Sequence, residues 1–125
     1  MILRCGVDLV EIERFQMQPR LRERFLARIF TPAEIELCAD KDQTFAGRFA
    51  VKEAVAKALG YGIGEISWQE IEVLMDEQRA PQLVLHGKAA ELAQALGLTQ
   101  WSVSISHQST LAVGMVVALG EEPPA

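Results

Sequence analysis

Alternating apolar and polar positions predict strands at several places along this chain. In the first strand, Leu3, Cys5, Val7 and Leu9 share one face, and Asp8 lies on the other. The last strand is almost entirely apolar, which is typical of a strand that is buried on both faces. The predicted strands span residues 1–10, 68–75, 82–86, 101–107 and 111–119.

Apolar residues that recur at steps of three and four predict helices between these strands. Leu21, Phe25 and Ile29 form the expected buried stripe of the first helix. Thr31 and Glu34 form a capping box, with a proline directly after Thr31, so a short helix is expected to begin there. The predicted helices span residues 19–30, 32–39, 44–60 and 88–96.

The order of these elements indicates the fold class. A strand is followed by three helices, a hairpin, a fourth helix and a second hairpin, and no internal linker divides the chain. Antiparallel hairpins combined with helices predict an α+β fold in one domain, residues 1–125. We expect the antiparallel sheet to pack against the long helix of residues 44–60.

Composition narrows the classes of function. A net charge of −5 argues against nucleic acid as a partner, and no apolar run approaches the ~20 residues of a membrane span. The first residues lack the apolar segment of a signal peptide. Cys5 and Cys38 fit reduced thiols better than a disulfide scaffold or a zinc site. We therefore expect a cytoplasmic protein.

The long helix of residues 44–60 carries two charged edges. Arg48 and Lys52 are four residues apart, and Glu53 and Lys57 repeat this spacing with charges of opposite sign. Two phenylalanines lie between the edges, so this side is expected to be covered by another element, another subunit or a ligand. These are Phe45 and Phe49.

Asp8 and Glu53 are the strongest candidates for chemistry. Two carboxylates suit a hard cation such as Mg²⁺, which takes phosphate oxygens and water as its remaining ligands. Nearby cations could hold phosphates, as phosphoryl-type transfer requires; the candidates are Arg48, Lys52, Lys57 and His107. Asp8 could equally be a strand-end residue satisfied by backbone donors, and His107 a structural histidine, so spacing alone leaves the reaction open.

Arginines recur at steps of four along the first predicted helix, at Arg20, Arg24 and Arg28. Such a row is either a solvated face or a docking surface for an acidic partner. Because the whole chain is acidic, the concentration of positive charge favours docking.

Two segments resemble the signatures of a known enzyme family. Residues 6–15, Gly-Val-Asp-Leu-Val-Glu-Ile-Glu-Arg-Phe, are similar to the first signature of the holo-acyl-carrier-protein synthases. Residues 49–60 resemble the second signature, Phe-Ala-x-Lys-Glu-Ala-x-x-Lys-Ala-x-Gly. Shorter matches occur at residues 30–34, 62–64 and 104–107, so the resemblance covers nearly the whole chain.

The resemblance implies a 4′-phosphopantetheinyl transferase, which moves the phosphopantetheine arm of coenzyme A to a serine of apo-acyl carrier protein. It implies that Asp8 and Glu53 hold Mg²⁺ and that Lys57 supports the phosphates. By the same resemblance, Arg48, Lys52, Gly64 and His107 are candidates for binding coenzyme A, and Arg14, Arg24 and Arg28 for docking the carrier. Small members of the family are typically homotrimers with active sites between subunits. The alternatives are a relative that binds without turnover and a structural trimeric module.

Overall fold

Three strands form the main antiparallel sheet of the computed structural model, which describes residues 1–123. They are β1 (Ile2–Glu11), β5 (Leu111–Gly120) and β4 (Leu98–His107), in the order β1-β5-β4. The first strand of the chain therefore pairs with the last, and this register sets Asp8 opposite Gly114. A register shift between Leu98 and Gln100 interrupts the pairing of β4 with β5.

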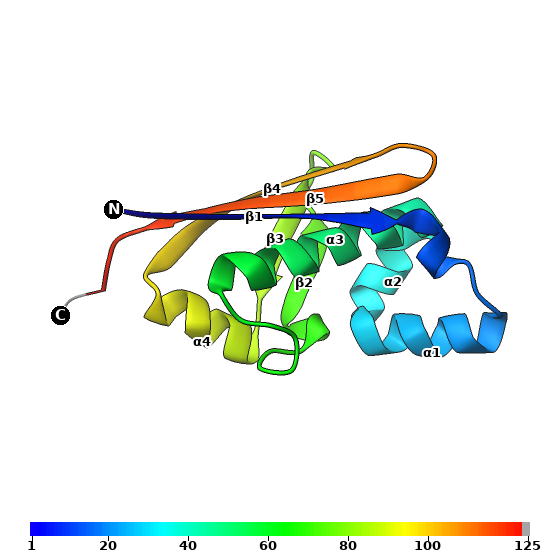
Figure 1. Ribbon diagram of the computed structural model, residues 1–125, viewed down its shortest axis with the longest axis horizontal. Coiled ribbons are helices and arrows are strands. Elements are labelled where there is room, and N and C mark those ends of the chain that lie inside the picture. Colours follow the sequence, from blue (N-terminus) through cyan, green and yellow to red (C-terminus); the bar gives the residue numbers. More distant parts are fainter. Residues whose placement is uncertain (124–125) are drawn as a thin grey trace.

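Helix α3 (Asp42–Leu59) lies along one face of this sheet, beneath β1 and β5 (Figure 1). Its close approach depends on glycine. A Cβ atom at Gly6 would lie 2.0 Å from the carbonyl oxygen of Ala54, and one at Gly114 would lie 2.5 Å from the backbone nitrogen of Val51. Neither contact leaves room for a side chain, so both strands touch the backbone of α3 directly.

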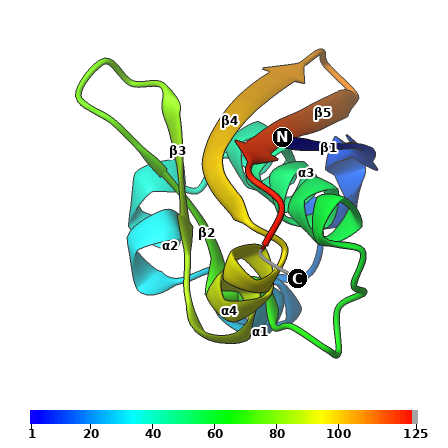
Figure 2. The ribbon, with the colours of Figure 1, turned by 90° about the vertical axis from the view of Figure 1, so that its left-hand side faces the viewer.

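A second sheet is the hairpin of β2 (Ile71–Met75) and β3 (Pro81–Leu85), which Figure 2 shows apart from the main sheet. The short 3₁₀ helix η2 (Trp68–Glu70) precedes the hairpin, and α4 (Gly87–Ala95) follows it. Residues of α3, the hairpin, α4, β4 and β5 share one hydrophobic core.

A second core is aromatic and lies at the N-terminal end of α3. It is enclosed by the 3₁₀ helix η1 (Ile12–Phe15), α1 (Pro19–Ile29) and α2 (Pro32–Cys38). Phe45 contacts Phe30, and Phe49 contacts Trp68, with ring centroids 5.0 and 4.9 Å apart. Other elements of the same chain therefore cover the two phenylalanines of the long helix, and no subunit or ligand is needed for this.

The predicted α+β class is confirmed, and so are the long helix packed on the antiparallel sheet and the capping box at Thr31. The predicted strand 68–75 instead begins with η2, and the predicted strand 101–107 begins earlier, at Leu98. Residues 121–125, which follow the last predicted strand, should form a tail, and the final two of them lie outside the residues that the structure describes. No helix within residues 1–123 is long and apolar enough to cross a membrane.

Two predictions about burial are wrong. Leu21 is not part of a buried stripe, since 56% of it is exposed; Leu26 and Ile29 are the buried residues of α1. Strand β5 is buried on the α3 face alone. The opposite face of the sheet exposes apolar side chains to solvent in the single chain: Leu3, Val7, Leu9, Leu111 and Met115. We call these five residues the outer sheet face.

Candidate functional site

Helix α3 reaches the surface at two side chains in its C-terminal half. From Phe45 to Leu59 every residue is buried except Glu53 and Lys57, which are four apart and therefore neighbours on one side of the helix. A helix that is otherwise enclosed exposes a carboxylate and an ammonium group at one place. This opening defines the candidate site.

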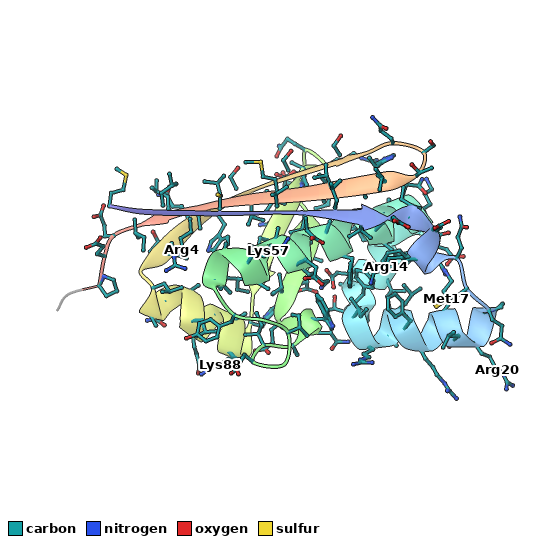
Figure 3. All side chains as sticks on the ribbon, in the orientation of Figure 1. Arg4, Arg14, Met17, Arg20, Lys57 and Lys88 are labelled. Atoms are coloured by element: carbon teal, nitrogen blue, oxygen red, sulfur yellow. The ribbon has the colours of Figure 1, made fainter. Side chains whose placement is uncertain are left out.

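Asp8 faces this opening from β1. It follows Gly6 on the face of the strand that contacts α3, and it lies opposite Gly114 of β5. Lys57 Nζ donates to Asp8 Oδ1 at 3.0 Å and to the carbonyl oxygen of Val7 at 2.9 Å. Figure 3 shows Lys57 on α3, beside β1. The close packing of strand and helix thus brings together two charges that are 49 residues apart in the sequence.

The carboxylate of Glu53 lies within the field of three charged neighbours. Partial burial raises its pKa, and the negative charge of Asp8 raises it further, whereas Lys57 and Arg14 lower it. Arg14 lies with its guanidinium carbon 5.2 Å from the ring centroid of Phe49, which places it beside the same part of α3. The site therefore holds two carboxylates that repel each other and cations that offset them in part.

The chemistry of this donor set fits a divalent cation. The negative charge of Asp8 raises the pKa of Glu53, and a metal ion between the two carboxylates would offset their repulsion. Carboxylate oxygens are also the ligands that Mg²⁺ prefers. Residues 1–123 contain no cluster of three or more His, Cys, Asp or Glu side chains able to hold a metal. Asp8 and Glu53 could hold Mg²⁺ only together with ligands from a substrate or from water.

The comparisons with known proteins identify the family. Residues 4–113 match the 4′-phosphopantetheinyl transferase superfamily. The chain belongs to this superfamily. It is similar to the holo-[acyl-carrier-protein] synthase of Herpetosiphon aurantiacus, with 46% identity over 95% of this chain and 100% of the relative. It is also similar to the enzyme of that name from Moorella thermoacetica, with 43% identity over 85% of each chain.

Solved structures of superfamily members have the same fold. A Helicobacter pylori holo-[acyl-carrier-protein] synthase in complex with coenzyme A matches with a TM-score of 0.82 and 36% identity, over 92% of this chain and 99% of that one. A Chronobacterium ammoniagenes complex of the synthase with coenzyme A matches with a TM-score of 0.83 and 30% identity, over 98% and 100% of the two chains.

In this member of the superfamily, Lys52 does not belong to the opening. Its ammonium group is completely buried and donates to Glu34 Oε1 at 2.8 Å and to the carbonyl oxygens of Trp68 and Ile71 at 3.0 and 2.5 Å. An ammonium group has three hydrogens, and all three are used. The structure therefore gives no support for the expectation that Lys52 contacts a phosphate.

Arg48 also points inward. It is 6% exposed, and its Nε donates to the carbonyl oxygen of Val73 in β2 at 3.1 Å. The single chain therefore does not bring Arg48 to Asp8 and Glu53, and it gives no support for the expected phosphate contact.

Glu34 is a functional candidate that sequence reasoning treated as a helix cap alone. The cap is present, because Glu34 Oε1 accepts from the backbone nitrogen of Thr31 at 2.9 Å. Its second role, as the partner of Lys52, joins residues 18 apart in the sequence. A signal existed, since both residues lie in segments that resemble the family, but nothing in their spacing pairs them.

His107 and Gly64 lie at two other places on the surface. His107 ends β4 and is exposed; with Leu9 and Leu111, among others, it lines a shallow hollow of about 210 Å³. Gly64 lies in the turn that follows α3, with a φ of +121° that favours glycine and with open space where a side chain would be. The structure does not bring His107 to Asp8 within one chain, because these residues lie on opposite edges of the sheet.

The arginines of α1 separate into two groups. Arg24 and Arg28 are exposed, as is Arg20, which Figure 3 labels at the start of the helix. Arg22 instead makes ion pairs with Asp40 and Asp42 and has little exposed surface. The exposed face of α1 thus combines free positive charge with the apolar side chain of Leu21.

Proposed function

We propose that this protein is a holo-[acyl-carrier-protein] synthase. It transfers the 4′-phosphopantetheine group of coenzyme A to a serine of apo-acyl carrier protein and releases adenosine 3′,5′-bisphosphate. The proposal is supported by membership of the superfamily and by relatives of that name at 43% and 46% identity. The observation that carries it is the meeting of Asp8, Glu53 and Lys57 at the one opening of α3.

The reaction replaces one phosphorus–oxygen bond by another. The serine oxygen bonds to the β-phosphorus of coenzyme A while the bond from that phosphorus to the bridging oxygen breaks, and the adenosine bisphosphate leaves with the bridging oxygen. The serine proton passes to water or to a carboxylate at the site. The main task of the protein is to orient the reactants and balance their charge.

Asp8 and Glu53 would hold Mg²⁺ at the opening, where it supplies charge neutralisation for the diphosphate. Lys57 is 55% exposed and is held by no more than two hydrogen bonds to β1, so its ammonium group can turn to a phosphate oxygen. Arg14 adds positive charge on the same side of α3. These cations would stabilise the charge that develops on the transferred phosphoryl group.

The exposed face of α1 is the proposed docking surface for the carrier protein. Arg24 and Arg28 offer positive charge to an acidic helix, and Leu21, about one turn before Arg24, offers an apolar contact. Arg14 lies between this helix and the opening of α3, so a carrier docked here would have its serine directed toward the site.

The proposed assembly is a cytoplasmic homotrimer that buries the outer sheet face. Leu3 and Leu9 are each 65% exposed in the single chain, and on the same face Val7 of β1 pairs directly with Met115 of β5. Apolar surface of this kind on a small protein usually marks an interaction site. In such a trimer, His107 and Gly64 could reach coenzyme A bound between subunits.

The deciding experiment measures the intact mass of apo-acyl carrier protein after incubation with this protein, coenzyme A and Mg²⁺. We expect a gain of one phosphopantetheine group, which EDTA prevents. Asp8→Ala should remain folded and lose transfer, because one of two metal-holding carboxylates is gone. A folded wild-type protein that leaves several apo carriers unmodified would contradict the proposal.

A further inference from the structure

A buried ion pair lies directly behind the opening of α3. Lys52 and Glu34 are both completely buried, with their charged atoms 2.8 Å apart. Besides Glu34, Lys52 binds the carbonyl oxygens of Trp68 and Ile71, so it ties α3 to η2 and to the start of β2. Each bond reaches a different part of the chain.

Glu34 connects the same region to two further segments. Its Oε1 accepts from Thr31 at the start of α2, and its Oε2 accepts from the backbone nitrogen of Val73 in β2 at 2.9 Å. A buried ion pair seldom stabilises a fold more than a well-packed apolar pair would, because both charges lose their hydration. Pairing of this kind is better suited to define one relative position of α2, α3 and β2.

The pair acts on the turn of α3 that carries the site. Lys52 immediately precedes Glu53, and successive side chains on a helix point about 100° apart. Lys52 therefore holds this turn from the side of β2, while Glu53 faces Asp8. On the sheet side, the backbone of the same turn rests on Gly6 and Gly114. Contacts on both sides prevent the helix from rotating or sliding.

We propose that Lys52, fixed by Glu34, is a positioning residue that sets Glu53 and Lys57 at their working distance from Asp8. This inference rests on the proposed transferase function. Lys52 contacts neither the substrates nor the metal; it acts by fixing the rotation of α3.

The test compares Lys52→Met with a control of similar destabilising effect. Methionine fills the space of the lysine chain and removes all three hydrogen bonds. Leu98→Ala opens a cavity in the core at the other end of the sheet. Leu98 pairs with Gly120 of β5, six residues along that strand from Gly114, the partner of Asp8. For each variant, kcat and the KM of the carrier are measured well below its Tm. In a separate titration with coenzyme A and without carrier, Mg²⁺ is added and the Tm is followed. The half-saturating Mg²⁺ concentration is the one that gives half of the total rise in Tm.

For Lys52→Met we expect kcat to fall on the order of 10- to 100-fold, because a small displacement of positioned groups costs this much. The half-saturating Mg²⁺ concentration should rise on the order of 10-fold. The KM of the carrier should change little, since Arg24 and Arg28 are exposed on α1, whereas Lys52 and Glu34 are completely buried. Leu98→Ala should lose Tm and keep all three of these values.

A second variant keeps the inference testable if Lys52→Met does not fold. Glu34→Gln combined with Lys52→Met removes both buried charges, so it should recover thermal stability without recovering kcat. Wild-type kcat and Mg²⁺ dependence in either folded variant would overturn the positioning role. A wild-type protein that responds to Mg²⁺ and coenzyme A but transfers nothing would contradict the proposed function instead, and the Mg²⁺ measurement would still decide the role of Lys52.

Discussion

The charged form of Glu53 costs the folded protein free energy. Burial and the nearby charge of Asp8 raise its pKa above the ordinary value of 4.5, so the folded state binds the proton more tightly than the unfolded chain does. Stability therefore falls as pH rises from 4.5 through the raised pKa, and the penalty is complete above it. At neutral pH, the ionised carboxylate of Glu53 therefore lowers the free energy of unfolding.

Glu53→Gln is accordingly expected to raise Tm at pH 7.5 by roughly a few degrees in the absence of metal. Well below pH 4.5, where Glu53 is protonated in both states, the two proteins should melt alike. Transfer should be lost, because the amide cannot replace the carboxylate as a Mg²⁺ ligand. The exposed Glu91 on α4 provides the control: Glu91→Gln should leave Tm and transfer unchanged, and an equal rise in that variant would refute the explanation.

The sequence predicts some residues of the site better than others, for a physical reason. Asp8, Glu53 and Lys57 were identified as candidates, and the structure brings them together. Arg48 and Lys52 have the same spacing as Glu53 and Lys57, yet they lie inside the protein. Periodicity shows which residues share a side of a helix. It does not show which sides are covered when a helix is enclosed almost completely.

At the scale of elements, α1 presents two faces with different tasks. Arg22 is tied to Asp40 and Asp42 and lies over the ring of Phe45 at 5.4 Å, so it fastens the helix to the start of α3. Arg24 and Arg28 are exposed, beside an apolar residue that the sequence assigned to the core. The error at Leu21 is informative, because an exposed leucine between free arginines fits a docking face better than a solvated one.

Charge reversal on this face should weaken docking alone. For Arg24→Glu or Arg28→Glu we expect the KM of the carrier to rise on the order of 10-fold, because an attraction becomes a repulsion. The KM of coenzyme A and the Tm should not change. The effect should shrink as salt is added, since exposed charges are screened. Arg79→Glu, in the exposed turn between β2 and β3, is the matched control, and an equal effect there would point to net charge instead of docking.

Helices and strands that depend on neighbouring residues could be predicted from the sequence. The contacts between elements that are distant in the chain could not. The capping box of α2 lies within four consecutive residues, and the sequence predicted it correctly. The contact of Gly6 with Ala54 and that of Gly114 with Val51 join segments that are far apart in the chain. No pattern within one segment reveals which backbone will lie against a glycine of another.

At the scale of the whole molecule, the main sheet has an apolar face that the single chain leaves exposed. Strand β5 was expected to be buried on both sides because it is apolar throughout, and α3 covers one side alone. The composition of β5 is explained if copies of the chain cover the outer sheet face. The sequence therefore indicated correctly that this surface is apolar, although it could not say that no element within residues 1–123 covers it.

A charge on the outer sheet face should separate the subunits. Leu9→Asp is expected to convert a trimer to monomers in analytical ultracentrifugation, because the aspartate is hydrated in the monomer and buried in the assembly. Transfer should fall with the loss of the trimer if coenzyme A binds between subunits. Leu21→Asp, an equally exposed position on α1, should stay trimeric. A wild-type chain that sediments as a monomer would remove the basis for the assembly.

The pairing of β1 with β5 also determines when the site can exist during synthesis. Asp8 leaves the ribosome before Glu53 and α3, and the strand that joins β1 to the sheet emerges after both. Until Gly114 and its neighbours are free to pair, β1 lacks its strand partner, and only its contacts with α3, such as the bonds from Lys57, hold Asp8 in place. The nascent chain therefore carries both carboxylates before the sheet is complete, and we expect activity only after β5 has emerged and paired with β1.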